Sequence, residues 1–197
     1  MHHIALALSL TLAAAPGAAE SAPEPLPPVA AEELLASLQA PVAFEDVRAD
    51  VADSQLEISF YLPEVGAVSM TFRADDDGAG VGLVKVEDAV VTEVRFVDGA
   101  VVSQTSNFAT LNPEQAVAVV ASLLQVWHDD AVTDALEHDR GLKCWWAGKI
   151  AGATMGIAAG AGCGLVAKNP TCIGIGWSVH NTVSGYISDK CNGAQNR

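Results

Sequence analysis

Short runs of alternating hydrophobic and polar residues fill the first half of the chain, from about residue 42 to residue 110. Leu56, Ile58 and Phe60 alternate with polar side chains, and a similar run is centred on Met70. This period of two is typical of strands that bury one face of a sheet. Further runs follow at 81–86, 90–97 and 101–102. The pattern predicts a small antiparallel sheet.

The turn residues between these runs support the same interpretation. Asp98-Gly99 stands between two hydrophobic runs, and this dipeptide is a strong signal for a two-residue hairpin. Another turn is predicted where Gly78 follows three aspartates. We therefore expect the strands to be joined by short connections.

The spacing becomes helical after residue 111. Asn112 is a favourable N-cap, Pro113 suits the first helical position, and Gln115 completes a capping box. Apolar residues then recur at helical spacing: Val117, Val120, Leu123, Leu124 and Trp127. We expect this helix to cover one face of the sheet, which gives an α+β domain.

Glycines recur at every fourth position in the last quarter of the chain: Gly148, Gly152, Gly156, Gly160 and Gly164. Each glycine inside a helix costs about 1 kcal/mol relative to alanine, so a close contact between backbones must offset the loss. After Asn169 and Pro170, small or polar residues recur again at helical spacing: Gly174, Ser178, Asn181, Gly185 and Ser188. We predict two antiparallel helices packed through these stripes, with apolar residues such as Ile150 and Ile187 pointing outward.

The four cysteines have nearly mirror-symmetric positions. Cys144, Cys163, Cys172 and Cys191 are separated by steps of 19, 9 and 19 residues. Four cysteines permit three pairings. In an antiparallel helical hairpin only the nested pairing joins residues at the same level, which would link Cys163 to Cys172 and Cys144 to Cys191. The predicted fold is thus an α+β domain with a small antiparallel sheet and a covering helix, followed by a disulfide-stapled, glycine-rich helical hairpin.

The beginning of the chain predicts export. Residues 1–19 combine an apolar core with small residues before Ala19, as expected of a signal peptide cleaved after that residue. Residues 20–30 form a proline-rich linker. Disulfides persist in the compartments that such proteins reach. We expect a secreted protein, with a periplasmic or envelope location as the alternative.

Charge separates two further regions. The acidic α+β domain, 31–139, belongs to a front part (1–139) with 23 acidic and four basic residues, a net charge of −19. The hairpin region, 140–197, carries six basic residues and one acidic residue, a net charge of +5. A solubilising acidic surface or a high-salt habitat is a simpler explanation of the acidic part. The sign change, however, coincides with the first cysteine.

The sequence offers no convincing catalytic or metal site. Asp75 and its two acidic neighbours lack the alternating ligands of a calcium loop, so a solvated turn is the better interpretation. His128 and His138 stand beside aspartates without a third ligand or a nucleophile at a suitable spacing. We therefore expect no enzyme activity, no cofactor and no nucleic-acid partner.

The hairpin also has features of a membrane-binding segment. Its first helix spans about 28 Å between Cys144 and Cys163, close to the thickness of a bilayer core. Lys143, Trp145, Trp146 and Lys149 cluster at one end, where cationic and interfacial aromatic side chains contact lipid headgroups. The alternative is a glycine- and alanine-rich tail that packs against the acidic domain.

The tail resembles the cysteine-rich peptides of the haloarchaeal microhalocin family and their bacterial relatives. The similarity covers about the last quarter of the chain. It rests on Cys144 with Ala147-Gly148, and on three further segments: Ala158-Ala159-Gly160-Ala161-Gly162-Cys163-Gly164-Leu165, Cys172-Ile173-Gly174 and Val183-Ser184-Gly185-Tyr186. Members of that family are antimicrobial peptides released from the end of a larger exported precursor, whose front part can confer immunity. They carry more cysteines, including close pairs that this chain lacks.

Two functions follow as expectations. The first is an exported precursor of a bacteriocin-like peptide, cleaved near Arg140 and masked by the acidic domain. Its hairpin would act on anionic membranes and could self-associate. The second is a secreted, periplasmic or envelope-associated binding protein, whose stapled hairpin is structural or contacts another protein.

Overall fold

The computed structural model describes residues 36, 38, 40–52, 54–75, 78–138, 144–167 and 171–195. Its strands are β1 (Glu45–Ala52), β2 (Gln55–Leu62), β3 (Gly66–Ala74), β4 (Gly80–Val86), β5 (Ala89–Val97) and β6 (Ala100–Ser106). Its helices are η1 (Phe108–Thr110), α2 (Pro113–Gln125), η2 (Val126–His128), α3 (Asp130–His138), α4 (Cys144–Ala167) and α5 (Thr171–Gln195). The α+β class predicted from the sequence is confirmed.

The strands form one antiparallel sheet in which each strand pairs with the next along the chain, in the order β1-β2-β3-β4-β5-β6. In β2 and β3 the apolar alternate positions are buried, and Ile58 pairs with Met70 across the ladder. The turn between β5 and β6 consists of Asp98 and Gly99, both with positive φ, as the two-residue hairpin requires. The alternation and the turn residues therefore predict this part of the fold correctly.

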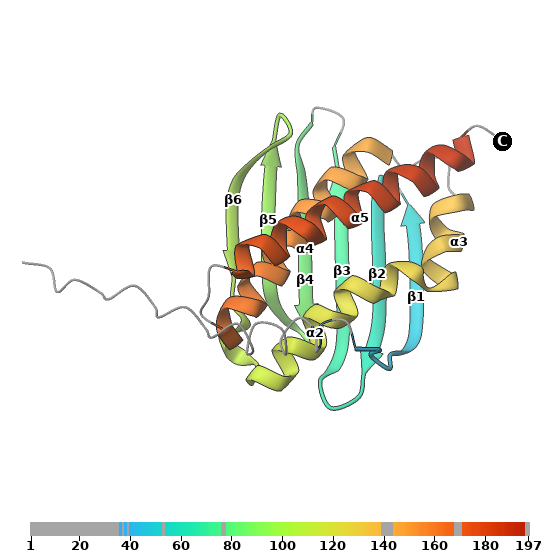
Figure 1. Cartoon of the computed structure of the whole chain (residues 1–197). Helices are drawn as coiled ribbons and strands as arrows, with labels where there is room; N and C mark the ends of the chain where they lie inside the picture. Colours follow the sequence, from blue (N-terminus) through green and yellow to red (C-terminus); the bar gives the residue numbers. More distant parts are fainter. Residues whose placement is uncertain are drawn as a thin grey trace, which may run out of the picture.

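The helices lie on one face of the sheet (Figure 1). α4 lies against β3, β4 and β5, α2 packs against α4, and α5 packs along α4 on the side away from the strands. Two glycines of β4 permit the close approach of α4: a Cβ atom at Gly80 would collide with Ile150, and one at Gly82 would collide with Thr154. The tail therefore supplies the helix nearest to the central strands.

The predicted start of α2 is present in full. The Asn112 side chain accepts a hydrogen bond from the Gln115 backbone, and the Gln115 side chain accepts one from the Asn112 backbone. At the other end of the helix, the Trp127 ring lies 5.9 Å from the Phe72 ring of β3 and donates a hydrogen bond to the Leu123 carbonyl. These contacts join the end of α2 to the sheet.

One expectation about the tail is wrong. We expected its apolar side chains to point outward, but most of the described ones belong to the core shared with the sheet: Ile150, Met155, Ile175, Val179, Val183 and Ile187 are buried. Of the others in that set, Ile157 is half-buried, and the side chains of Val166 and Ile173 lie outside the described part of the chain. The reason is that the apolar face of the sheet needs a cover, and the tail provides it.

Candidate functional site

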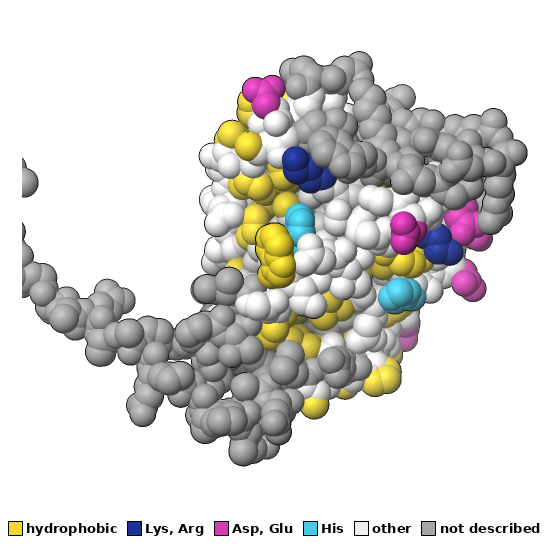
Figure 2. Space-filling view, turned by 45° about the horizontal axis from the view of Figure 1, so that its top comes forward, with side chains coloured by type: hydrophobic (Ala, Val, Ile, Leu, Met, Phe, Trp, Pro, Cys, Tyr) yellow, Lys and Arg dark blue, Asp and Glu magenta, His cyan; other side chains and the backbone are white. Residues whose placement is uncertain are grey.

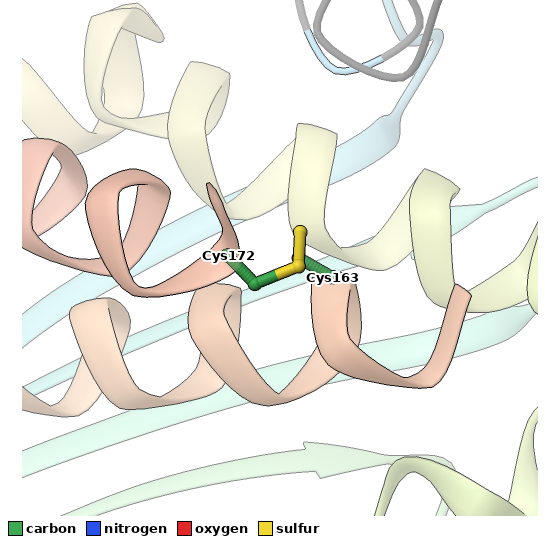
Figure 3. The surroundings of a disulfide bond; sticks show 2 residues. All are labelled: Cys163 and Cys172. Carbon is green, nitrogen blue, oxygen red and sulfur yellow. A yellow bond between two sulfur atoms is a disulfide. The ribbon is translucent and has the colours of Figure 1, made fainter. Parts of the chain in front are cut away.

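α4 and α5 are joined by a disulfide between Cys163 and Cys172, nine residues apart, with Cα atoms 5.4 Å from each other (Figure 3). This is the inner bond of the predicted nested pairing. Cys191 is buried and also disulfide-bonded. The side chain of Cys144, its predicted partner, lies outside the described residues.

Replacing both Cys163 and Cys172 with serine is expected to lower the free energy of unfolding by about 2–3 kcal/mol. A short covalent loop restricts the unfolded chain by about that amount. Urea unfolding followed by circular dichroism measures the change, and Ser178→Ala at an exposed position of the same helix is the control. An unchanged urea midpoint in the double variant would contradict the expectation.

Four glycines at every fourth position of α4 face the backbone of α5. A Cβ atom at Gly152 would lie 2.8 Å from the His180 carbonyl oxygen, and one at Gly156 would lie 2.6 Å from the Gly176 carbonyl oxygen. Gly148 similarly faces Ser184 and Ser188, and Gly160 faces Cys172 at 3.5 Å. The two helices are therefore in backbone contact along this stripe.

Of the small residues that we expected on α5, Ser188 is in this contact, and Gly174, Ser178 and Gly185 are not. Gly174 and Gly185 have open space where a Cβ atom would be, and Ser178 is exposed. Gly164 at the end of the α4 stripe also has open space. Sequence reasoning missed Gly176, whose close contact with Gly156 becomes visible only when the two helices are placed together.

Most residues of the predicted membrane-binding and processing sites lie outside the part of the chain that the structure describes. This applies to Ala19, Arg140 and Lys143, and to the side chains of Trp145 and Trp146. Lys149 is described and is half-buried. Within the described ranges, no helix is long and apolar enough to cross a bilayer.

A groove lies between β6 and the helix pair, and we call it the β6–helix groove. Its volume is about 690 Å³. Its lining consists of Gln104 and Ser106 from β6, Ala153, Gly156, Ile157, Gly160 and Ala161 from α4, and Cys172, Gly176, Trp177 and His180 from α5. The groove exists because α4 lies against β3, β4 and β5 and leaves part of β6 uncovered.

The α5 side of the groove carries an exposed aromatic residue. Trp177 is 68% exposed, and its ring stacks on His180 with ring centroids 5.6 Å apart. Hydrophobic side chains and histidine side chains reach the surface on the helical face of the molecule (Figure 2). A tryptophan in this position offers a large, flat, apolar contact surface for a ligand.

The rest of the groove wall carries few polar side chains. None of its described lining residues is Asp, Glu, Lys or Arg, and its polar side chains are those of Gln104, Ser106 and His180. The Ser106 hydroxyl lies 3.2 Å from the Thr92 hydroxyl, within hydrogen-bond distance. Among the residues that the structure describes, no three His, Cys, Asp or Glu side chains are grouped to hold a metal ion.

Polar contacts join the tail to the acidic part of the chain. Lys190 of α5 forms an ion pair with Glu137 of α3 at 2.9 Å. Beside it, the hydroxyl groups of Tyr186 and Thr133 are 2.9 Å apart, and the Tyr186 ring packs edge-on against His128. These contacts link α5 to the helix that precedes the tail.

No protein-family model, curated protein or solved structure matches this chain.

Proposed function

We propose that this protein is an exported, non-enzymatic binding protein that acts as an intact chain. Its β6–helix groove holds an uncharged, mainly apolar small molecule. The observation that carries this proposal is the groove itself, with small apolar walls, an exposed tryptophan and a few polar groups. Its volume of about 690 Å³ falls within the range of small-molecule sites, about 300–1,000 Å³.

Charge favours an uncharged ligand. The whole chain has a net charge of −14, which repels anions, and no lysine or arginine is among the described residues of the groove wall. No described carboxylate lines the groove to hold a cation either. Gln104 and Ser106 supply the groups that would orient a ligand by hydrogen bonds.

The position of the tail favours an intact chain. Ile150, Met155 and Ile187 are fully buried in the core shared with the sheet. Burial of each such side chain contributes about 1.5–3 kcal/mol. Release of the tail would expose these side chains together with the sheet residues beneath them, so cleavage alone would leave the two parts associated.

The binding proposal is tested with N-phenyl-1-naphthylamine, an uncharged apolar fluorophore. We expect saturable binding of one fluorophore per chain. Trp177→Ala is expected to weaken binding about tenfold, because the lost aromatic contact is worth about 1–1.5 kcal/mol. Ala153→Phe should abolish binding by filling the groove.

The matched control is Tyr61→Ala. It removes an exposed aromatic side chain of β2 that does not line the groove, and it should leave binding unchanged. The thermal midpoint of each variant shows whether the fold is kept. Non-saturable fluorescence, or equal affinity in the parent chain, Trp177→Ala and Ala153→Phe, would exclude the groove as the site.

A second candidate is the exported precursor of a bacteriocin-like peptide. Two observations support it: the apolar residues of the tail are covered, as in a masked toxin, and Lys190 of the cationic tail pairs with Glu137 of the acidic part. The acidic domain would mask the hairpin until cleavage near Arg140, and the released hairpin would act on anionic membranes.

Secreted material distinguishes the two candidates. Mass spectrometry detects either the uncleaved chain or a fragment that begins near Gly141. The oxidised fragment 141–197, applied to dye-loaded anionic vesicles, would cause leakage if it is a membrane-active peptide. An intact secreted chain together with an inactive fragment would eliminate the precursor.

A further inference from the structure

The two edges of the sheet are protected differently. β1 carries four charged residues, Glu45, Asp46, Arg48 and Asp50. The pairing register shifts in the ladders of both edge strands, β1 with β2 and β6 with β5, so this irregularity does not distinguish them. α3 also packs against β1 (Figure 1). Charges, bulges and covering helices are the usual means by which proteins prevent an edge strand from pairing with another chain.

β6 shares the register shift of β1 but not its charges. Its seven residues, Ala100–Ser106, include no charged residue and no proline, and every one of them is exposed. β6 pairs with β5 on one side, and no other described strand pairs with its outer side. An uncharged, exposed edge of this length is a template for the addition of another strand.

Exposed apolar side chains are concentrated at the same end of the sheet. Of the six large hydrophobic residues exposed in the described part of the chain, four are valines of β5 and β6: Val90, Val97, Val101 and Val102. Val102 is 59% exposed. Such a concentration at one edge is typical of an interaction surface rather than of scattered surface residues.

We propose that β6 is a self-association edge, at which two copies of this chain pair antiparallel about a two-fold axis and join their sheets. Charge points to a second copy. Two chains of net charge −14 repel each other least where neither carries charge, and β6 carries none. On β5, Glu93 and Arg95 neutralise each other as an ion pair. The proposal is independent of the ligand in the groove.

The register that pairs the whole strand places Ser103 opposite Ser103 of the copy, because Ser103 is the central residue of β6. Val102 then lies opposite Gln104 of the copy. No charged residues face each other in this register, so no cross-strand repulsion opposes it. The interface is the same patch on both copies, as two-fold symmetry requires.

Sedimentation equilibrium of the full chain tests the proposal. We expect twice the chain mass, with tighter association at high salt, because salt screens the repulsion between the acidic copies. Ser103→Lys and Ser103→Asp should each weaken association at least tenfold by placing like charges opposite each other. An equimolar mixture of the two variants should recover the dimer, because the opposed charges are then complementary.

Asp50→Asn is the matched control, because it changes the net charge by the same amount as Ser103→Lys but on the β1 edge. Its association should equal that of the parent chain or exceed it slightly. A parent chain that stays monomeric at high salt and high concentration would overturn the proposal. So would a dimer that Ser103→Lys and Ser103→Asp leave intact.

Discussion

A chain that ends at residue 138 is expected to lose its cooperative unfolding transition. Truncation removes α4 and α5, and thereby uncovers the apolar face of β3, β4 and β5. Each large apolar side chain that loses its cover costs about 1.5–3 kcal/mol, and several together exceed the usual stability of about 5–15 kcal/mol. Near-UV circular dichroism and calorimetry measure the loss.

A nicked chain is the control for that truncation. A site for a sequence-specific protease, inserted after residue 140, allows cleavage without removal of the tail. We expect the two pieces to elute together from a sizing column, because buried contacts hold them. A truncated chain with a sharp calorimetric transition, or nicked pieces that separate, would show that the tail is detachable. Either result would favour the precursor over the binding protein.

Gly156→Ala and Gly174→Ala are expected to change stability in opposite directions. At Gly156 a Cβ atom would lie 2.6 Å from the Gly176 carbonyl oxygen, so α4 and α5 must move apart. Overpacking of this kind costs about 1–3 kcal/mol. At Gly174 nothing lies within 4 Å, and alanine should add up to about 1 kcal/mol through its higher helix propensity.

Urea unfolding measures both changes under the same conditions. Gly185→Ala serves as a second variant at an open position and should match Gly174→Ala. If all three substitutions stabilise the protein equally, α4 and α5 are not in close backbone contact at Gly156. The comparison separates close helix contact from the general cost of glycine in a helix.

These results bear on function because they decide whether the tail is a structural layer or a stored peptide. The β6–helix groove has walls from both α4 and α5, so it exists only while the tail is in place. The proposed dimer forms through the outer edge of β6, the edge that does not pair with β5. A folded, intact chain is therefore required for ligand binding and sheet pairing together.

Several features were predictable because their causes are local. Asp98-Gly99 adopts the positive φ angles of a hairpin, and Asn112 with Gln115 forms a capping box. The cysteine spacing predicted the Cys163–Cys172 bond because two helices on either side of a short turn are antiparallel. β1 was not identified as a separate strand, since its charged residues make its apolar alternation weak.

The orientation of the tail was not predictable in the same way. α4 is apolar or small on nearly every side, so its sequence does not indicate which side faces a partner. Glycines at Gly80 and Gly82 of β4 make room for Ile150 and Thr154, but this match becomes visible only when strand and helix are placed together. For the same reason Gly176 was missed and Gly174 was chosen.

Residue order along this chain was thus sufficient for strands β2 to β6, the turn, the helix start and the inner disulfide, because each depends on neighbours in sequence. The cover of the sheet by α4, the groove beside β6 and the exposed uncharged edge depend on surfaces that are distant in sequence. Shape complementarity between such surfaces is a property of packed layers, and it emerged here only from the folded arrangement.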